Sequence, residues 1–410
     1  MKNLVLLAIA SVLFLLQCNS KEEQVWTDTI QIKNPKQLGV DTIPAQRIAL
    51  GVSGDYKPCI ARLPNGELQV VAFQMHKVDS TRKIIDKDVP LTREEIILFR
   101  SQDGGITWSE AETLDIPGRE PYFTILSDGT ILITVHLLIQ DVRNEFGYVQ
   151  TYVHRSTDGG QTWKTTRFPG ENLPGWKSGW VTCSSRNILE LRDGSLILGV
   201  GTMEGHISLF RSRDKGVTWQ LAESCEFELF DSEKDRKKLA YSILQEAILS
   251  EAPNGDLLAL CRVDSKLFPP LTGHEQVDGH WDHHNRLVLY RSKDGGKYWS
   301  FAEFGSTYGE MYPAILKLHD GRLLLTFTVR DMHPPLGVQA VLGKETVDGF
   351  EFDFDHDRLM LDTKTPTGKP SGGGFGRSVQ LDDGTLVTSY SYRGEDDKLH
   401  LEVVRWNMPN

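Results

Sequence analysis

The 410-residue sequence is 39% hydrophobic and 25% charged, which is enough apolar material to bury a large core in one or two domains. Its formal net charge of −11 argues against a nucleic-acid partner, because proteins that bind phosphate backbones usually carry a basic face. After the first residues, no stretch is long and apolar enough to cross a membrane.

The first residues have the pattern of an export signal. Lys2 precedes an apolar run, Leu4 to Leu16, that is too short to span a bilayer comfortably. The run ends at Gln17-Cys18 and resembles a bacterial lipoprotein signal in which Cys18 is lipidated, although Gln17 stands where a small residue is usual. An ordinary cleaved secretory signal is the alternative.

The stretch Asn19 to Glu23 resembles the acidic export tag of surface-exposed lipoproteins in some Gram-negative bacteria. We therefore expect a signal peptide over residues 1–18, a tether and N-terminal segment over 19–45, and one folded domain over 46–410. The expected location is the surface of the outer membrane, through a lipid anchor, or the periplasm or medium if the anchor is absent.

Four cysteines follow the leader, and none forms a CxxC pair, so a zinc site is not expected. They are Cys59, Cys183, Cys225 and Cys261. Export permits disulfides, but three of the four lie in apolar, strand-like runs, so buried free thiols are favoured.

Six copies of one hairpin signal organise the rest of the chain. An Asn-Gly or Asp-Gly pair precedes an apolar run each time, and this pair suits a type I′ turn, which needs positive φ at both central positions. Successive turn glycines are 63, 65, 61, 66 and 63 residues apart, and they are Gly66, Gly129, Gly194, Gly255, Gly321 and Gly384. The regular spacing predicts six structural repeats.

A second motif, Ser-x-Asp-x-Gly-x-Thr/Tyr-Trp, lies between these hairpins. It begins at Ser101, Ser156, Ser212 and Ser292. Each copy follows a strand-like run, and its Gly supplies a tight turn into another strand, so each repeat should hold four antiparallel strands. Six repeats predict an all-β fold, a six-bladed β-propeller with four antiparallel strands in each blade.

The sixth repeat lacks its fourth strand, because the chain ends at Asn410, where the next box would begin. Residues just after the leader, such as Val25 to Ile32 or Arg47 to Val52, are expected to supply it. Strands from the two ends of the chain would then close the ring.

The boxes and the hairpin turns fall on the same face of the predicted ring. A box Asp can hydrogen-bond the backbone of its own turn, and a box Trp can pack between blades, so the boxes are interpreted as structural. The starts of the first strands and the loops between second and third strands lie on the opposite face, where chemistry is expected.

The boxes in a six-fold array resemble the sialidase (neuraminidase) superfamily of BNR or Asp-box repeat proteins, over roughly residues 50–410. The resemblance implies a sialidase-like propeller and an exo-acting glycoside hydrolase that takes a glycan and needs no cofactor or metal. In that superfamily three arginines hold a substrate carboxylate, a Glu activates a nucleophilic Tyr, and an Asp is the general acid and base. Related propellers also house other glycosidases and non-catalytic glycan binders.

The fourth repeat resembles this arrangement in spacing. Glu246 begins its first strand and Arg262 ends its second, so both reach the same face, like the superfamily's Glu and second Arg. A surface salt bridge is the alternative for this pair. Arg330 ends the second strand of the fifth repeat and corresponds to the third Arg, although the superfamily's Arg usually lies closer to the following strand.

Two positions depart from the superfamily pattern. The first Arg is replaced by Tyr56-Lys57, and Lys57 can bind an anion only as a point charge and not as a planar fork. The nucleophilic Tyr is replaced by Phe375, which has no oxygen to attack with. Arg377, two residues later, is an additional cation that is expected to bind substrate.

Loops on the same face supply further candidates. The general acid is expected in the loop of residues 75–94, where Asp79, Asp86 and Asp88 are available. The His-rich loop of residues 273–286 is favoured as a sugar-binding rim with His280 and Trp281 as contacts, and a metal cluster is the alternative.

Arg119-Glu120 opens the first strand of the second repeat, in the position that Glu246 holds in the fourth. Two carboxylates that face a common axis suit acid–base glycoside hydrolysis without a nucleophilic Tyr. The alternative is that Arg119 and Glu120 pair with neighbours. His136, at the end of the next strand, can serve as an acid or a base.

The sequence therefore predicts a surface-anchored glycoside hydrolase that resembles sialidases and cleaves a terminal, acidic sugar. The predicted catalytic residues are Glu246, Glu120 and Asp79, and the predicted substrate-binding residues are Lys57, Arg119, Arg262, Arg330, Arg377, His136, His280 and Trp281. Another glycosidase or lyase on the same scaffold and a non-catalytic glycan-binding lipoprotein are the alternatives, because of the changes at Phe375 and Lys57.

Overall fold

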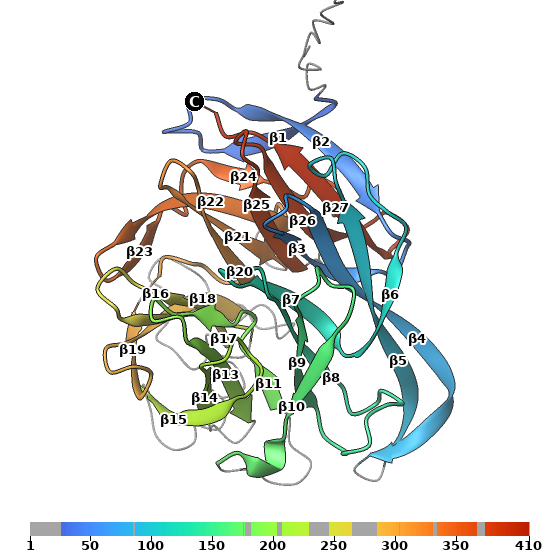
Figure 1. Ribbon diagram of the computed structural model, residues 1–410. Coiled ribbons are helices and arrows are strands. Elements are labelled where there is room, and N and C mark those ends of the chain that lie inside the picture. Colours follow the sequence, from blue (N-terminus) through green and yellow to red (C-terminus); the bar gives the residue numbers. More distant parts are fainter. Residues whose placement is uncertain are drawn as a thin grey trace, which may run out of the picture.

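The computed structural model shows an all-β protein (Figure 1). It describes residues 26–84, 87–174, 176, 182–202, 207–228, 246–264, 285–302, 304–330, 334–366 and 374–409. Within these ranges the only helix is a three-residue 3-10 turn, η1 (Gly170–Asn172). No helix in this part of the chain could span a membrane.

Two separate four-stranded antiparallel sheets follow each other in the first half of the chain. The first consists of β3 (Tyr56–Arg62), β4 (Leu68–Ile84), β5 (Lys87–Ser101) and β6 (Glu112–Pro117). The second consists of β7 (Arg119–Ile125), β8 (Ile131–Leu137), β9 (Gln150–Ser156) and β10 (Lys164–Phe168). In both sheets, strands that are consecutive in the chain are neighbours.

The third sheet joins two antiparallel sets. One set is β11 (Thr182–Ser184), β12 (Leu189–Glu190), β13 (Leu196–Thr202), β14 (Ile207–Ser212) and β15 (Gln220–Phe227). The other is β16 (Ile248–Glu251), β17 (Leu257–Asp264), β18 (Asn285–Ser292) and β19 (Tyr298–Ala302). A short parallel pairing between β15 and β19 connects them.

The fourth sheet also joins two sets, and it contains both ends of the described chain. One set is β20 (Glu310–Lys317), β21 (Leu323–Val329), β22 (Gly337–Thr346), β23 (Gly349–Phe352) and β24 (Arg358–Met360). The other is β25 (Gly374–Gln380), β26 (Leu386–Arg393), β27 (Leu399–Trp406) and β2 (Thr42–Leu50). β1 (Asp28–Lys33) pairs with β2 and with β24 and so links the two sets.

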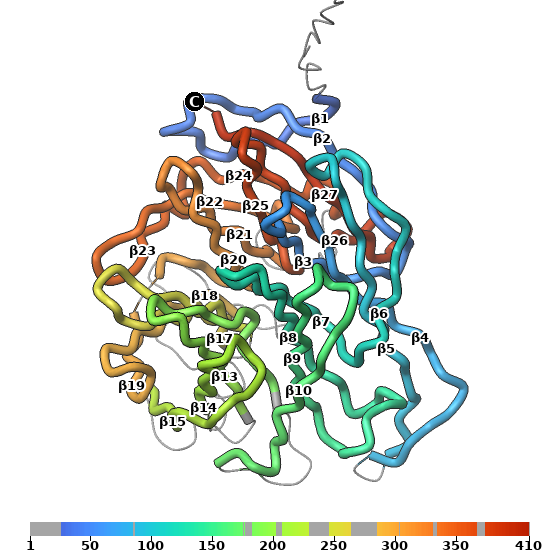
Figure 2. The backbone as a smooth tube through the Cα atoms, in the orientation of Figure 1, coloured from blue at the N-terminus to red at the C-terminus, as the bar shows by residue number. Residues whose placement is uncertain are grey.

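The predicted closure between the chain ends is confirmed, because the N-terminal β2 pairs antiparallel with the C-terminal β27. Contacts between neighbouring sets then form a cycle: β25 with β3, β3 with β7, β8 with β11, β12 with β16, β16 with β20, and β20 with β25. In Figures 1 and 2, β3, β7 and β20 lie toward the middle and β6, β19 and β23 toward the rim. The prediction of six four-stranded blades is confirmed only in part, since two of the four sheets each join two sets.

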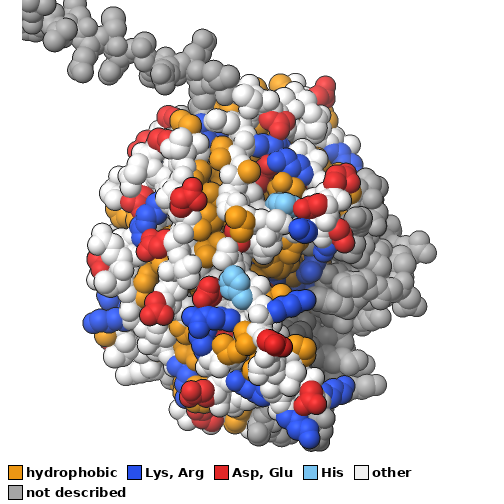
Figure 3. Space-filling view, turned by 90° about the vertical axis from the view of Figure 1, so that its right-hand side faces the viewer, with side chains coloured by type: hydrophobic (Ala, Val, Ile, Leu, Met, Phe, Trp, Pro, Cys, Tyr) orange, Lys and Arg blue, Asp and Glu red, His pale blue; other side chains and the backbone are white. Residues whose placement is uncertain are grey.

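Hydrophobic cores lie between neighbouring sets. Phe73 of β4 packs in one cluster with Phe123 of β7, and Leu260 of β17 packs in another with Phe327 of β21. The predicted free thiols are confirmed for the four described cysteines, of which Cys59 and Cys261 are buried. On the face shown in Figure 3, acidic and basic side chains are interspersed and not separated by sign.

The four boxes stabilise their own turns, as predicted. Asp103 accepts hydrogen bonds from Ser101 Oγ (2.9 Å), from the backbone N–H of Thr107 (2.9 Å) and from Thr107 Oγ1 (2.5 Å), and the same pattern recurs around Asp158 and Asp214. The fourth box has Tyr298 in place of Thr, and only the backbone N–H of that residue reaches Asp294.

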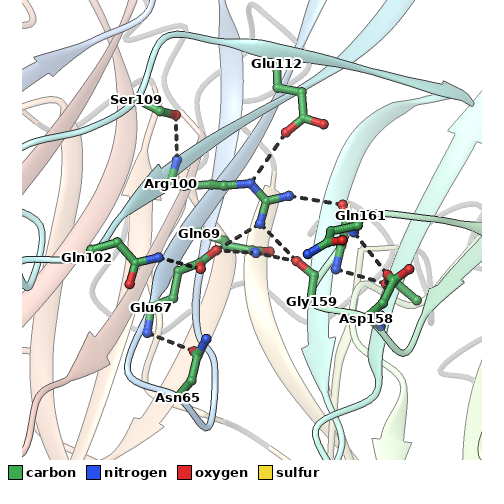
Figure 4. Close-up of polar contacts among 12 residues, drawn as sticks. Asn65, Glu67, Gln69, Arg100, Gln102, Ser109, Glu112, Asp158, Gly159 and Gln161 are labelled. Carbon is green, nitrogen blue, oxygen red and sulfur yellow. Dashed lines mark hydrogen bonds and ion pairs between the residues drawn. The ribbon is translucent and has the colours of Figure 1, made fainter.

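The Arg that precedes the first, second and fourth boxes also connects neighbouring sets. Arg100 Nη1 donates to the carbonyl oxygen of Gly159 in the next box (2.9 Å) and to Glu67 Oε1 (2.9 Å), as Figure 4 shows. Arg155 Nε donates to the carbonyl of Lys215 in the third box (2.8 Å). These hydrogen bonds are stronger than average because the guanidinium donor is charged.

We predict that Arg155→Met lowers the free energy of unfolding by about 1–3 kcal/mol, because it removes a charged donor and leaves the carbonyl of Lys215 without it. Arg213→Met is the matched control, since Arg213 is exposed, and it should change stability by less than about 0.5 kcal/mol. Urea denaturation of the three proteins measures both values. Equal effects of the two substitutions would contradict a connecting role for Arg155.

Candidate functional site

Five of the repeats begin their first strand with a non-glycine residue in the left-handed backbone region. These are Lys57, Glu120, Glu246, Tyr312 and Phe375, with φ between 50° and 65°. Each lies nine positions before the turn glycine of its hairpin. A bulge interrupts strand pairing at this place in β3, β7, β20 and β25. Such a backbone costs roughly 1–2 kcal/mol per residue, and strain of this kind tends to occur at functional sites.

The five strained side chains meet in one place, which we call the central cluster. Lys57 Nζ lies 2.5 Å from Glu120 Oε1 and 4.8 Å from the ring centre of Phe375. The rings of Tyr312 and Phe375 meet edge to face at 4.9 Å. Glu246 reaches Tyr312 through Arg262, as described below. One side chain from each of five repeats therefore points toward a common centre, and in four of them a bulge lies at this place.

The two carboxylates of the cluster are held near each other by Arg186. Arg186 Nη2 lies 3.2 Å from Glu246 Oε1 and 3.9 Å from Glu120 Oε2, so these two oxygens are at most about 7 Å apart. Arg186 and both glutamates line one small pocket, together with His136 and Tyr122. Arg186 Nε is buried and makes no hydrogen bond with the described residues.

Both carboxylates are ionised. Burial opposes the ionisation of Glu120, but Lys57 and Arg119 outweigh it and hold its pKa well below the usual range. Burial also opposes the ionisation of Glu246, and there Arg186 and Arg262 outweigh it and lower its pKa. Glu246 is the more accessible of the two, with 25% of its side chain exposed against 8% for Glu120.

Tyr312 places a phenol oxygen between two arginines. Its hydroxyl accepts hydrogen bonds from Arg262 Nη1 (2.8 Å) and from Arg330 Nη1 (2.9 Å). Arg262 Nη1 also bonds Glu246 Oε2 (3.1 Å), so one guanidinium bridges the phenol and the carboxylate. Burial raises the pKa of Tyr312 to about 12, although Arg262 opposes the shift, and the hydroxyl therefore keeps its proton at neutral pH.

Lys57, His136 and Glu94 are among the other titratable groups at or beside the cluster whose pKa values are shifted. Burial lowers the pKa of Lys57 to about 8, against the attraction of Glu120. Burial lowers the pKa of His136 to about 4, so its imidazole is neutral at pH 7. Glu94 pairs with Arg119 at 3.1 Å, and burial raises the pKa of Glu94 to about 7.

The structure brings together most of the residues predicted from the sequence. Contacts or the shared pocket connect seven of them: Lys57, Arg119, Glu120, His136, Glu246, Arg262 and Arg330. The alternative that Arg119 and Glu120 pair with neighbours also holds, since Arg119 Nη2 lies 3.3 Å from Glu120 Oε1. These pairs are part of the site.

Other predicted residues are not brought into the cluster. Asp79 and Asp88 are exposed on the long β4–β5 hairpin. Arg377 lies in a different cavity, where its Nη1 donates to the carbonyl of Phe123 (2.5 Å). Several predictions lie outside the described residues, namely Cys18, Asp86, His280 and Trp281. The other histidines of the His-rich loop, which the alternative of a metal cluster would use, also lie outside them: His274, His283 and His284.

Arg186 and Tyr312 were missed by sequence reasoning. Tyr312 carried a signal, because it lies nine residues before Gly321, as Glu246 lies nine before Gly255. In the third repeat, the residue nine positions before the turn glycine is Ser185. Arg186 is the next residue, so the nine-residue spacing does not identify it. In the described ranges, no three His, Cys, Asp or Glu side chains gather in a way that could hold a metal ion.

Comparisons with known proteins place the chain in a family. A family model described as "BNR repeat-like domain" matches residues 15–325, which is more than half of the chain. Sialidases from two Vibrio cholerae O1 strains are 28% identical over 147 residues, which cover 30% of this chain and 19% of each relative. The chain thus aligns with about a fifth of the length of these relatives.

Solved structures show the same fold. A protein of unknown function from Dyadobacter fermentans matches 89% of this chain and 99% of its own, with a TM-score of 0.60 and 21% identity. The intramolecular trans-sialidase from Ruminococcus gnavus, solved with oseltamivir carboxylate, matches 87% of this chain and 95% of its own, with a TM-score of 0.56 and 12% identity. The chain therefore belongs to the family of proteins with a BNR repeat-like domain and has the fold of the sialidase-like superfamily.

Proposed function

We propose that the protein is an exo-acting glycoside hydrolase, anchored at the cell surface, that removes a terminal acidic sugar from a glycan. One observation carries the proposal: four arginines converge on five strained residues, which include two ionised carboxylates and a protonated phenol. We also infer that the six antiparallel sets are the six blades of one propeller, with β2 as the last strand of the sixth. In such a ring the first strand of every blade can contribute to one axial pocket.

The charge of the cluster favours an anionic ligand. Five cations lie at the site, namely Lys57, Arg119, Arg186, Arg262 and Arg330, against the two ionised carboxylates of Glu120 and Glu246. Glu94, behind Arg119, is only partly ionised at neutral pH because its pKa is about 7. Guanidinium groups suit planar carboxylates, so an acidic sugar fits better than a neutral one.

The chemistry would divide between the phenol and the more accessible carboxylate. Tyr312 keeps its proton at neutral pH, so it can donate to a leaving oxygen. Glu246 is ionised and partly exposed, so it can activate water or attack the sugar, whereas Glu120 is occupied by Lys57. Arg262 and Arg330 would bind the substrate carboxylate beside Tyr312. This scheme needs no oxygen at Phe375.

A lyase that cleaves an acidic sugar by β-elimination is the second candidate, and the neutral His136 favours it. In that reaction a base removes the proton next to the carboxylate, the glycosidic C–O bond breaks, and a double bond forms in the sugar ring. Arginines beside the substrate carboxylate would stabilise the intermediate carbanion, and a neutral imidazole can take the proton.

We predict that one acidic glycoside in a panel of α-sialosides, uronides and neutral glycosides is cleaved, and that Glu246→Gln and Tyr312→Phe each lower kcat about 100-fold or more. The reason is that each removes a group proposed to act on the reacting bond. Release of a chromogenic leaving group measures hydrolysis, and ultraviolet absorbance of the unsaturated sugar measures elimination.

Glu110→Gln and Tyr298→Phe serve as matched controls, because both residues are exposed and lie outside the cluster, and both should keep full activity. An intact Glu246→Gln rate would remove Glu246 from the mechanism. Binding of acidic glycans without turnover of any substrate would instead support the non-catalytic glycan binder.

We predict that kcat/KM for the acidic substrate falls as the pH rises through about 8, because Lys57 then loses its charge while the arginines keep theirs. The expected loss is about tenfold, the effect of one charge-assisted hydrogen bond. Lys57→Arg should move this limb to higher pH. A pH profile with an unchanged alkaline limb in Lys57→Arg would exclude Lys57 as its cause.

The free energy of unfolding should rise over the pH range in which kcat/KM falls. The folded-state pKa of Lys57 is about 8 and lies below its ordinary value of 10.5, so burial of the charged form costs stability below pH 8. That cost disappears as the pH rises from about 8 toward 10.5. Thermal denaturation between pH 8 and 10.5 should therefore show no destabilisation from Lys57. A fall in kcat/KM over this range can then be assigned to weaker substrate binding and not to unfolding.

We predict that Cys18 carries the lipid anchor. In a Gram-negative host, a clickable fatty acid should label the natural chain but not Cys18→Ser, and the variant should leave the membrane fraction. Cys225→Ser is the control, because Cys225 lies in β15 and outside the leader. Protease treatment of intact cells then tests surface exposure. Equal labelling of Cys18→Ser would disprove lipidation at this residue.

A further inference from the structure

A second and larger cavity lies farther along the first strands than the central cluster. Its volume is about 440 Å³, within the range of small-molecule sites. Its walls come from β7, β12, β16, β20 and β25, with further side chains from β21, β22 and β23. Tyr122 lines both this cavity and the pocket of the central cluster, so the two spaces are neighbours.

Three carboxylates line the second cavity, and each has a basic partner. Glu190 pairs with Lys215, Glu251 lies 4.0 Å from Arg192 Nε, and Glu345 lies 2.5 Å from Lys317 Nζ. Within each pair, the opposite charges of the acid and the base neutralise each other. Arg377 is the remaining ionised side chain of the lining, and no carboxylate within the described ranges pairs with it.

The contacts of Arg377 leave part of its guanidinium without an acceptor. Nη1 donates to the carbonyl of Phe123 (2.5 Å) and lies 3.6 Å from Cys59 Sγ, and the guanidinium lies over the ring of Tyr122 at 5.0 Å. For Nε and Nη2 there is no acceptor in the part of the chain that the structure describes. The side chain is surrounded by protein yet keeps some exposed surface, as expected of a cation that borders a cavity.

Burying a charge without a partner is costly, and proteins normally neutralise such a group with an acid or a bound ion. The three carboxylates of the lining already neutralise other basic side chains, so a pair with Arg377 would require one of them to leave its present partner. The cavity beside it offers apolar walls, from Ile125, Ile248, Ile315, Leu323 and Phe350. A cation at one end and apolar walls around it are complementary to an anion with an apolar body.

We propose that this cavity binds a small organic monocarboxylate, with the carboxylate on Arg377 and the apolar body against the isoleucines and Phe350. The fork of Nε and Nη2 matches the two oxygens of one carboxylate. The site does not depend on the proposed glycosidase function, because no residue of the central cluster takes part in it. Arg377 was expected to bind the substrate of the central site, and this proposal gives it a different ligand.

The test is isothermal titration of the purified protein with benzoate and hexanoate, and with benzyl alcohol as a neutral analogue of similar shape. Both carboxylates should bind at one site, and benzyl alcohol should bind at least about tenfold more weakly. Arg377→Gln should weaken benzoate binding at least about tenfold, and Arg377→Lys, which keeps the charge but not the fork, should weaken it less. Circular dichroism shows whether each variant is folded.

Two further variants separate this site from the central one. Glu246→Gln should leave benzoate binding unchanged, whereas it affects the proposed hydrolysis. Arg192→Gln, in a charge pair at the same cavity, should change the affinity less than Arg377→Gln does. Absence of carboxylate binding by the folded natural protein, equal binding of benzyl alcohol, or equal affinity in Arg377→Gln would each overturn the proposal. Benzoate binding that is lost in Glu246→Gln would assign it to the central cluster.

Discussion

The arrangement of the site depends on closure of the ring between the two ends of the chain. β2 pairs with β27, and Arg405 at the end of β27 donates to the carbonyl of Gly104 in the first box (2.9 Å). Because of this closure β3 and β25, which are more than 300 residues apart in the chain, become neighbours. Lys57 of β3 and Phe375 of β25 can then meet at 4.8 Å. Without that pairing, β27 would keep an open edge and the cluster would lose its first and last members.

Strain and buried charge in the centre have to be offset by the rest of the ring. Five left-handed residues cost roughly 1–2 kcal/mol each, and burial of Lys57, Glu120 and Arg186 adds a desolvation penalty. The stabilising contributions lie away from the centre, in the cores between sheets, in the boxes, and in the arginines that connect a strand to the neighbouring box. The outer parts of each repeat hold the structure, so its inner strand can carry an unfavourable backbone for the site.

Much of the fold could be predicted from the sequence because the repeat is local. The backbone geometry of an Asn-Gly or Asp-Gly turn, and of a box, is determined by a few adjacent residues. The hairpins could therefore be predicted from these motifs and their spacing, and the closure of the ring from the missing fourth strand of the sixth repeat. The site could be predicted where a charged residue stood at the start of a first strand, as for Glu246, or at the end of a second strand, as for Arg262 and Arg330. Tyr312 obeys the same nine-residue spacing to its turn glycine but was overlooked, because a Tyr before an apolar run is typical of a core. The direction in which Arg377 points depends on packing among three repeats and had no signal in the local pattern.

Although position 375 is Phe, a phenol lies at the centre of this ring. Tyr312 supplies an oxygen from the neighbouring repeat, and its ring contacts Phe375 edge to face at 4.9 Å. The ring of Phe375 instead supports two buried cations, because the guanidinium of Arg186 lies 3.1 Å from its centre and Lys57 Nζ lies 4.8 Å away. A Tyr at 375 would bring a second hydroxyl to a cluster in which Tyr312 already supplies one. Phe375 and Tyr312 therefore have complementary parts in the cluster, since one ring supports its cations and the other supplies its phenol oxygen.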